Sequence, residues 1–411
     1  MSRLDKLIEK FCPDGVEFCK LKDVAEIGTG SSDRKNATDD GIYPFYVRSK
    51  DILKINNYEF DEEAIVIPGE GGIGEIFHLV KGKYALHQRA YRIHLKKKDV
   101  LIGFLFHYMK SNFKAFINKK AVSATVTSIR KPMIEEFKLP VPPLEVQAEI
   151  VRILDNFTEL EKELEKELEL RRKQYEYYRD LLLDFRDVHA GGTNAYSVPW
   201  LADMLHELCP DGVEYRKLAE IFNTKNGYTP SKVNKDYWNN GTVPWFRMED
   251  IRENGTILNH AIQNVSETAI KGSLFPADSI IVATSATIGQ HALIKVPSIA
   301  NQRFTYLMVK EDFKEQFDVK FLYYYCFKLD EYCKECLNQG NFAAVDMKKF
   351  AKFEFSIPPL SVQQRIVDIL DRFDALCNDI SSGLPAEIAL RRKQYEYYRD
   401  KLLNFKELKE A

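Results

Sequence analysis

The stretch LRRKQYEYYRD occurs twice in this chain of 411 residues, at Leu170–Asp180 and again, unchanged, at Leu390–Asp400. Upstream of each copy lies a second shared block. VPPLEVQAEIVRILDNF at Val141–Phe157 returns as IPPLSVQQRIVDILDRF at Ile357–Phe373. The copies are about 220 residues apart, which is far longer than the period of about 20–50 residues of solenoid proteins. The sequence therefore predicts a duplicated domain-plus-helix unit and a molecule with pseudo-twofold symmetry.

Weaker echoes extend the duplication toward the N-terminus of each half. CPDGVEF at Cys12–Phe18 returns as CPDGVEY at Cys209–Tyr215, YPFYVRSKDI resembles VPWFRMEDI, and IGEIFHLVKGKYALHQRAY resembles IGQHALIKVPSIANQRFTY. The offset between the copies is not constant. We therefore expect the segments of variable length to lie between the shared blocks.

The segment after each Pro-Pro-Leu has the apolar pattern of a long helix. Most apolar residues recur at spacings of three and four, which is typical of an amphipathic or coiled-coil seam. In the first copy the seam is Ile150, Ile153, Phe157, Leu160, Leu164, Leu168, Tyr175, Tyr178, Leu182 and Phe185; in the second it is Ile366, Ile369, Phe373, Leu376, Ile380, Tyr395, Tyr398, Leu402 and Phe405. SSGLP at Ser381–Pro385 predicts a break or kink in the second helix. The two seams are expected to pack on each other in antiparallel fashion; the alternative is that each helix lies on its own domain.

Charge is distributed unevenly along the chain. The formal net charge is −2, which excludes a uniformly basic nucleic-acid-binding protein. Residues 18–140 contain 21 Lys and Arg against 15 Asp and Glu, whereas residues 141–187 contain 8 against 13. Residues 214–355 are nearly neutral, at 18 against 17. The first long segment is therefore suited to facing phosphate, and the acidic helix after it is suited to protein contact.

These patterns divide the chain into six parts. They are an N-terminal segment 1–17, a mixed α/β domain 18–140, a long helix 141–187, a linker and repeat start 188–213, a second mixed domain 214–355 and a second long helix 356–411. Short strands are predicted at Ile65–Pro68, Arg92–Leu95, Ser279–Ala283 and Phe304–Val309, and helices at Asp99–Asn118 and Phe313–Leu337. The absence of an apolar run of eighteen residues, the charged N-terminus and seven sparse cysteines predict a cytoplasmic protein without membrane spans.

Several strings imitate catalytic motifs, but none fits its chemistry. PDGVEFCK resembles a nuclease metal motif, yet Asp14 and Glu17 are only three residues apart, so Pro-Asp-Gly is better interpreted as a turn. GEGGIGE at Gly69–Glu75 becomes ATSATIG in the second half and keeps only its last glycine, which favours a tight turn beside a binding surface. No phosphate-binding loop and no Asn/Asp-Pro-Pro-aromatic box of amino-methyltransferases occurs.

Cysteine and histidine give no better candidates for a metal or catalytic centre. Cys333 and Cys336 form a CxxC with Cys326 nearby, but no fourth ligand lies within thirty residues, so packing in a helix is the preferred interpretation. His87 in HQR corresponds to Asn301 in NQR, and a catalytic histidine would not become asparagine. We therefore predict no catalytic residues, no bound metal and no enzyme activity for this chain alone.

Taken together, the paired PPLxxQxxIVxILDxF and LRRKQYEYYRDxLL helices behind two variable domains resemble the specificity (S) subunit of type I restriction–modification systems. The resemblance covers nearly the whole chain. It implies an α+β fold with two globular target recognition domains, near 18–140 and 214–355, separated by a pair of long antiparallel coiled-coil helices. It further implies that each domain reads one half of an asymmetric, bipartite DNA target.

The resemblance also implies partners. Two modification (M) subunits would bind the repeated helices and would carry S-adenosylmethionine, so this chain itself is expected to bind no cofactor. The restriction (R) subunit would join through that complex. For M binding we predict residues shared by both helices, namely Arg171, Arg172, Gln174, Tyr175, Tyr178, Arg391, Arg392, Gln394, Tyr395 and Tyr398. Because the tyrosines also lie on the seam, part of this set is expected in the core of the helix pair.

DNA contacts are predicted at polar and basic residues in loops around the shared blocks. Arg suits guanine, Gln suits adenine, and Lys more often binds phosphate. The predicted set is Arg34, Lys35, Arg48, Lys50, Gln88, Arg89, Lys119, Lys120 and Arg130 in the first domain, and Lys225, Tyr228, Lys232, Arg247, Arg252, Gln302, Arg303, Lys348 and Lys349 in the second. Gln88, Arg89 and their copies have an alternative role as braces of the fold, since shared residues cannot by themselves encode two different sequences.

Three other classes of protein remain as alternatives. A stand-alone DNA-binding regulator would use the same two domains without partners. A self-sufficient methyltransferase or nuclease would need a catalytic motif that is not found. A pure protein scaffold would leave the charge of the first domain unexplained.

Overall fold

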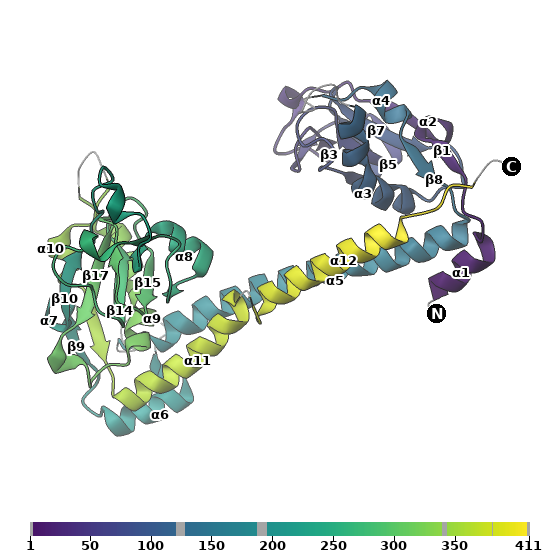
Figure 1. Ribbon diagram of the computed structural model, residues 1–411. Helices are drawn as coiled ribbons and strands as arrows, with labels where there is room; N and C mark the ends of the chain where they lie inside the picture. Colours follow the sequence, from purple (N-terminus) through teal and green to yellow (C-terminus); the bar gives the residue numbers. More distant parts are fainter. Residues whose placement is uncertain (1–2, 121–127, 187–194, 339–342, 380, 409–411) are drawn as a thin grey trace. The chain divides into compact units, whose positions relative to one another are not determined.

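The computed structural model describes residues 3–120, 128–186, 195–338, 343–379 and 381–408, and its chain forms two compact units (Figure 1). Unit 1 comprises Met1–Glu165 with Ile388–Ala411, and unit 2 comprises Lys166–Glu387. The division falls inside both repeated helical regions rather than at their ends. Each unit therefore combines one globular domain with helical segments from both copies of the repeat.

Unit 1 is built on a six-stranded sheet with the order β2-β7-β5-β6-β3-β4, in which only the β3–β6 pair is parallel. A two-stranded ribbon of β1 and β8 closes the domain where the long helix begins. The strands are β1 (Phe18–Lys20), β2 (Ala25–Thr29), β3 (Tyr43–Tyr46), β4 (Ile52–Ile55), β5 (Phe60–Pro68), β6 (His78–Leu86), β7 (Ala90–Leu95) and β8 (Lys138–Pro140). The helices are α1 (Arg3–Phe11), α2 (Leu21–Val24), η1 (Arg34–Asn36), α3 (Ile102–Lys120), α4 (Lys131–Glu135), the first part of α5 (Leu144–Leu182) and most of α12 (Leu384–Leu402).

Unit 2 repeats this plan with a five-stranded sheet, β10-β17-β14-β15-β12, a three-stranded sheet, β13-β11-β16, and a ribbon of β9 and β18. Its strands are β9 (Glu214–Lys217), β10 (Phe222–Asn226), β11 (Val243–Phe246), β12 (Ile257–Leu258), β13 (Asn264–Val265), β14 (Ser279–Ala283), β15 (His291–Ile294), β16 (Ile299–Ala300), β17 (Phe304–Val309) and β18 (Glu354–Ile357). Its helices are η3 (Ala195–Ser197), α6 (Pro199–Leu208), α7 (Leu218–Ile221), η4 (Lys235–Tyr237), α8 (Met248–Asn254), η5 (Glu267–Ala269), η6 (Glu311–Phe313), α9 (Val319–Glu335), α10 (Met347–Phe350) and α11 (Leu360–Asn378).

Proline explains the main difference between the two sheets. In unit 1 the single strand β6 pairs with both β5 and β3. In unit 2 the equivalent stretch is divided into β15 and β16 around Pro297, which has no N–H to donate to a strand pairing.

The four strands and two helices predicted from the sequence are all confirmed, with β14 and β17 at the predicted bounds.

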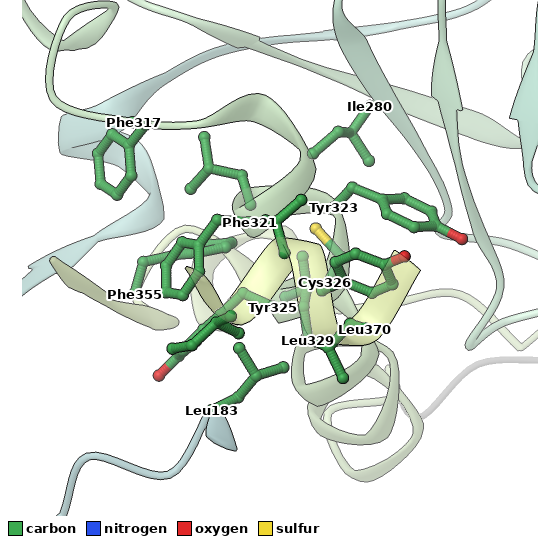
Figure 2. Close-up of a cluster of buried hydrophobic side chains, with 14 of the residues drawn as sticks. Leu183, Ile280, Phe317, Phe321, Tyr323, Tyr325, Cys326, Leu329, Phe355 and Leu370 are labelled. Carbon is green, nitrogen blue, oxygen red and sulfur yellow. The ribbon is translucent and has the colours of Figure 1, made fainter. Parts of the chain in front are cut away.

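The core of unit 2 gathers around α9, whose six consecutive residues 321–326 are all buried (Figure 2). Phe321, Cys326 and Leu329 are buried there against Ile280 of β14 and Leu370 of α11. α6 contributes Leu201 and Leu205 to the same core. Residues 195–208, which lie within the segment predicted as linker and repeat start, thus form structure just ahead of Cys209 as α1 does ahead of Cys12.

The predicted packing of the two seams is confirmed in each unit. In unit 1 the ring of Phe157 stacks on Tyr398 with centroids 5.5 Å apart, and Arg392 bonds to Glu161 and Glu165. In unit 2 the ring of Phe373 stacks on Tyr178 at 5.6 Å. Phe157 and Phe373 are copies of one residue, as are Tyr178 and Tyr398, so each copy of the repeat packs on the other copy. In unit 1, the earlier residue Phe157 of α5 contacts Tyr398 near the end of α12, whereas the later Glu161 contacts the earlier Arg392. The two helices therefore run antiparallel.

The predicted break in the second helix is also confirmed. α5 is continuous over 39 residues, whereas α11 ends at Asn378 and α12 begins at Leu384. Asp379 accepts hydrogen bonds from the N–H and hydroxyl of Ser381, and these bonds hold the pKa of its carboxyl at about 2. Within the described residues, no helix is long and apolar enough to cross a membrane.

A buried glutamine anchors each repeated helix to its own domain. Gln147 donates to the carbonyls of Asp99 and Pro142 and accepts from the N–H of Leu101, at 2.7–2.8 Å. Gln363 makes the same three bonds, to the carbonyls of Gln316 and Pro358 and from the N–H of Asp318. Both side chains are fully buried. The PPLxxQ motif is thus a structural joint between helix and domain.

Replacing Gln147 or Gln363 by leucine will destabilise the unit that contains it. Each substitution leaves three backbone groups without a partner, which we expect to lower the free energy of unfolding by about 2–4 kcal/mol. Urea unfolding of the full chain measures the effect. Gln364→Leu is the matched control, because Gln364 is exposed on the same helix. Equal stability of Gln363→Leu and Gln364→Leu would contradict the anchoring role.

Candidate nucleic-acid interface

Five chain segments of unit 1 meet around Glu70, just after β5. The N–H of Gly69 donates to the carbonyl of Arg89 at 2.9 Å, and the N–H of Ile129 donates to the carbonyl of Gly69 at 2.8 Å. Ser32 and His87 form an adjacent bridge. Residues 32–34, 47–49, 69–71, 87–89 and 128–130 therefore converge on one place, here called the recognition frame of unit 1.

Glu70 joins two of the predicted DNA-binding arginines in this frame. Its Oε2 accepts from Arg48 at 2.9 Å and from Arg89 at 3.0 Å, and these hydrogen bonds, Arg89 foremost, lower the pKa of the carboxyl. The carboxylate consequently stays charged. The frame contains a cavity of about 260 Å³, which is lined by Arg34, Val47, Arg48, Ser49, Glu70, Gly71 and His87. The frame as a whole holds Arg34, Arg48, Arg89 and Arg130 against Asp33 and Glu70, which leaves it positive.

Unit 2 builds the same frame with the same backbone hydrogen bonds. The N–H of Thr284 donates to the carbonyl of Arg303 at 3.0 Å, and the N–H of Val345 donates to the carbonyl of Thr284 at 2.9 Å. The glycines retained after β5 and β14 both have positive φ, +72° at Gly74 and +84° at Gly289. The interpretation of this loop as a tight turn is confirmed.

The exchange of histidine for asparagine between the copies has a structural cause. The N–H of Arg89 donates to Nδ1 of His87 at 2.9 Å, and the N–H of Arg303 donates to Oδ1 of Asn301 at 3.0 Å. Both side chains thus accept the same backbone proton and fix the same turn. Burial, together with the nearby Arg48, lowers the pKa of His87, so its ring is kept neutral and able to accept.

Gln88 and Gln302 also bond inside the fold. Gln88 donates to Asp33 at 3.1 Å, and Gln302 accepts from the hydroxyl of Thr229 at 2.5 Å. Both glutamines tie the turn to the loop that follows the first strand of the sheet. These contacts favour the bracing role, although both side chains remain exposed and DNA contact stays a prediction for them.

The arginine after each glutamine has different surroundings in the two units. Ser285 occupies the place of Glu70 in the frame of unit 2, as the matching bridges Glu70–Ser128 and Ser285–Ala344 indicate. Arg303 therefore has no carboxylate partner within the described part of the chain, whereas Arg89 has Glu70. The same arginine of the repeat is thus paired with a carboxylate in unit 1, as Arg89, and has no such partner among the described residues in unit 2, as Arg303.

The other predicted DNA-binding residues lie at varied distances from the frames. Arg34 and Arg130 are exposed within the frame of unit 1, and Lys35 and Lys50 are exposed directly beside it in sequence. Lys119 is exposed near the end of α3, and the side chain of Lys120 lies outside the described residues. In unit 2, Lys225 stands over the ring of Phe275, the hydroxyl of Tyr228 accepts from the N–H of Lys271, and Arg247 stands over the ring of Trp245. Lys232 is exposed, and Lys348 and Lys349 lie in α10. Arg252 lines a different cavity, beside Arg179 and His291.

Sequence reasoning missed the carboxylate and the aromatic rings of these sites. Glu70 lies in a loop that was interpreted only as a turn, and its partners are 22 and 19 residues away. Trp238 and Trp245 lie in a cationic pocket of unit 2, as described below. The only signal for them was the aromatic pair within YWNNGTVPW, which is equally typical of a core.

The cysteine-rich stretch of α9 belongs to the core. Cys326, Cys333 and Cys336 are buried, and burial raises the pKa of Cys333 to about 12, so the thiol stays protonated. Among the residues that the structure describes, no group of three or more His, Cys, Asp or Glu side chains could hold a metal ion.

The predicted partner-binding residues divide between the helix pair and the solvent. Tyr175 is buried, and Tyr178 and Tyr398 stack on the opposite helix. Several others bond along or across the helices: Arg171 to Glu167 and Gln174, Arg391 to Gln394, Arg392 to Glu161 and Glu165, and Tyr395 to His107. Arg172 is exposed. Partner binding by this set stays a prediction.

A second apolar face of the same helices is left exposed. Leu170 and Tyr177 are 62% and 54% exposed, and their copies Leu390 and Tyr397 are 55% and 63% exposed. Residues seven apart lie on one side of a helix, so each pair forms one patch, here called the outer face. The outer face was not identified from the sequence. It could have been, because Tyr177 lies between the seam residues Tyr175 and Tyr178 and must therefore point away from the seam.

Comparison with known proteins connects both repeats to one family. The family model described as "Type I restriction modification DNA specificity domain" matches residues 13–170 and 210–390. The chain is 53% identical to the type I restriction enzyme EcoprrI specificity subunit of Escherichia coli over 203 residues, which are 47% of this chain and 51% of that one. The chain thus spans about half the length of this relative. A putative type I restriction enzyme specificity subunit of Haemophilus influenzae is 28% identical over 98% of both chains. A solved structure concerning complex assembly and conformational transition of the type I R-M system has the same fold, with a TM-score of 0.60, 15% identity and coverage of 95% of this chain and 98% of that one.

Glu70→Gln will strengthen binding of a DNA duplex by releasing Arg48 and Arg89. Because each additional phosphate contact steepens the dependence of log affinity on log salt by about 0.9, we expect a slope steeper by about one to two. Fluorescence anisotropy at several salt concentrations measures it. Glu63→Gln is the control, since Glu63 lies on β5, seven residues before Glu70, with only a long 3.9 Å contact to Lys81. An unchanged slope in Glu70→Gln would show that these arginines do not meet phosphate.

Proposed function

We propose, because the chain belongs to the family of type I restriction–modification DNA specificity domains, that it is the DNA-recognition subunit of a type I restriction–modification complex. The observation that carries the proposal is the recognition frame, which occurs once in each unit with the same backbone bonds and different side chains. A shared frame with different contents suits the reading of two different half-sites. The target is accordingly asymmetric and bipartite.

The chemistry of the two frames supports double-stranded DNA as the ligand. Unit 1 offers four arginines beside two carboxylates, Glu70 being paired with Arg48 and Arg89, and unit 2 offers Arg247 and Arg303 without carboxylate partners in the described residues. Arginine is the side chain best suited to paired acceptors on guanine, and lysines at the margin suit phosphate. The nearly neutral second domain therefore depends on a few unpaired cations and aromatic rings rather than on bulk charge.

Two modification subunits are proposed to bind the outer faces. Leu170 with Tyr177, and Leu390 with Tyr397, give the chain the same exposed apolar patch twice, each flanked by identical charged residues. An identical surface presented twice suits two copies of one partner. In this proposal the modification subunits supply S-adenosylmethionine and adenine methylation, the restriction subunit joins the same complex, and this chain supplies only recognition.

A genome-wide map of adenine methylation tests the proposed function. Cells that express this chain together with its modification subunit are expected to show one split, asymmetric motif, and cells that express either alone are expected to show none. Methylation by this chain alone would assign it a catalytic site. The absence of any motif beside a competent modification subunit, with specific DNA binding by the purified chain, would favour the stand-alone regulator.

The outer faces predict a stepwise change in stoichiometry. Leu170→Ala with Tyr177→Ala should remove one modification subunit, Leu390→Ala with Tyr397→Ala should remove the other, and all four changes together should abolish assembly. Native mass spectrometry of the purified complexes counts the subunits. Ile42→Ala, which trims a side chain 76% exposed in the first domain, is the control. Full occupancy of the fourfold variant would exclude these patches as the docking surface.

A further inference from the structure

A pocket of unit 2 combines cations and aromatic rings without any acidic side chain. Its volume is about 310 Å³. It is lined by Lys232, Lys235, Trp238, Asn239, Trp245, Arg247 and Gln263. Lysine and arginine attract phosphate, tryptophan offers a flat apolar surface, and the amides add hydrogen-bonding groups. This combination matches a nucleotide unit of a nucleic acid.

The two tryptophans are fixed in place by the loop between β10 and η4. The indole N–H of Trp245 donates to the carbonyl of Tyr228 at 3.2 Å, and that of Trp238 donates to the carbonyl of Ser231 at 3.0 Å. Their rings meet edge to face with centroids 4.8 Å apart. Both N–H groups are thus used inside the protein, and because Trp245 is buried, apolar contact with a ligand falls mainly to the partly exposed Trp238.

Arg247 is held over one of these rings with its hydrogen-bonding capacity unused. Its guanidinium carbon lies 5.2 Å from the centre of the Trp245 ring, and its backbone N–H donates to the buried Asp250 at 2.7 Å. Its Nε is buried and has no hydrogen-bond partner among the described residues. A buried Nε cannot itself reach a ligand, so contact falls to the two terminal nitrogens of the guanidinium, for which the described residues supply no hydrogen-bond acceptor.

The equivalent place in unit 1 has different chemistry. Trp245 corresponds to Phe45, since both pair with the neighbouring parallel strand, at Ile299 and Ala85 respectively. Phe45 is fully buried, and the nearby Arg48 is bound to Glu70. Trp245 is also buried, at 5% exposed, so the difference lies in the arginine and in the second, partly exposed ring of Trp238. The combination of an arginine without a carboxylate partner and two tryptophans therefore belongs to the second unit alone among the described residues of the two frames.

We propose that this pocket takes one guanine nucleotide of the duplex target, with Arg247 donating to O6 and N7 of the base and Lys232 and Lys235 bound to adjacent phosphates. Guanine presents two acceptors and no donor at its major-groove edge, which matches the paired donors of a guanidinium. Adenine presents a donor beside its acceptor and leaves one arginine N–H unmatched. The inference rests on the proposed function and makes Arg247 the residue that specifies one G·C pair in one half-site.

The first test replaces Arg247 by lysine in the complete complex with its modification subunits. Lysine keeps the positive charge over the ring and loses the forked pair of donors. Duplexes in which each base pair of the target is changed in turn are compared by competition binding. In the wild type, replacing the specified G·C pair should cost roughly ten- to a hundredfold in affinity. In Arg247→Lys that discrimination should fall to about twofold at this one position, with the other half-site unchanged.

The matched control is Arg216→Lys, because Arg216 carries the same charge in the same unit, is paired with Glu214 on β9 and belongs to no predicted site. Retained discrimination at every position in Arg247→Lys would overturn the inference while leaving the proposed function intact. A wild-type complex with no preferred sequence at all would instead overturn the proposed function. Thermal melting of each variant establishes that a loss of discrimination does not come from unfolding.

Intrinsic fluorescence gives a second, independent readout. The chain has three tryptophans, of which Trp200 lies apart beneath Arg365, so a Trp200→Phe chain reports Trp238 and Trp245 alone. The target duplex should change this emission, and a duplex lacking the specified G·C pair should change it less. No change with bound target would overturn the inference. Equal saturation by guanosine monophosphate at the same concentrations would overturn the DNA assignment in favour of a free-nucleotide site.

Discussion

The stacking of each repeated phenylalanine on the tyrosine of the other copy is the contact on which the architecture depends. Phe157 meets Tyr398 in one unit, and Phe373 meets Tyr178 in the other, with nearly equal ring separations and angles. Neither repeat can bury its helix seam alone, because its partner aromatic comes from the second copy. This mutual dependence explains why LRRKQYEYYRD is identical in both halves: each tyrosine must fit the same phenylalanine, so both helices are held to one sequence.

The domains carried by these helices share only what the frame requires. Gln147 and Gln363 join helix to domain by the same three bonds, and His87 and Asn301 accept the same backbone proton with different atoms. Between these fixed points the side chains differ. Glu70 against Ser285 changes the charge of the frame, and Phe45 against Trp245 changes its buried aromatic ring, while the backbone bonds stay the same. A duplicated protein can in this way keep one geometry and offer two chemistries.

Much of the fold could be predicted from the sequence because the duplication supplies its own comparison. Blocks shared between the halves indicate the helices and the turn at Gly74 and Gly289, whereas the glycine and proline of SSGLP indicate the break at Ser381–Pro385. The candidate site was less predictable, because its decisive contacts join residues that are distant in sequence, such as Glu70 with Arg48 and Arg89. Periodicity also assigned tyrosines to the seam without showing that Tyr177 points outward, since a single sequence gives the phase of a helix only where its buried face is known.

The net charge of each domain does not show which of its arginines can bind DNA, because that depends on whether each arginine already has a carboxylate partner. The first domain has the larger positive charge, yet Arg48 and Arg89 share a carboxylate whose lowered pKa keeps it ionised. DNA that approaches these arginines must compete with Glu70, so contact there is opposed by a local anion. The second domain is nearly neutral, but Arg247 and Arg303 have no such competitor among the described residues, and Arg247 is already oriented by Trp245. The net charge of a domain and the availability of its arginines are therefore separate properties. Net positive charge attracts the phosphate backbone of the duplex, whereas the arginines without a carboxylate partner determine which base edges receive hydrogen bonds.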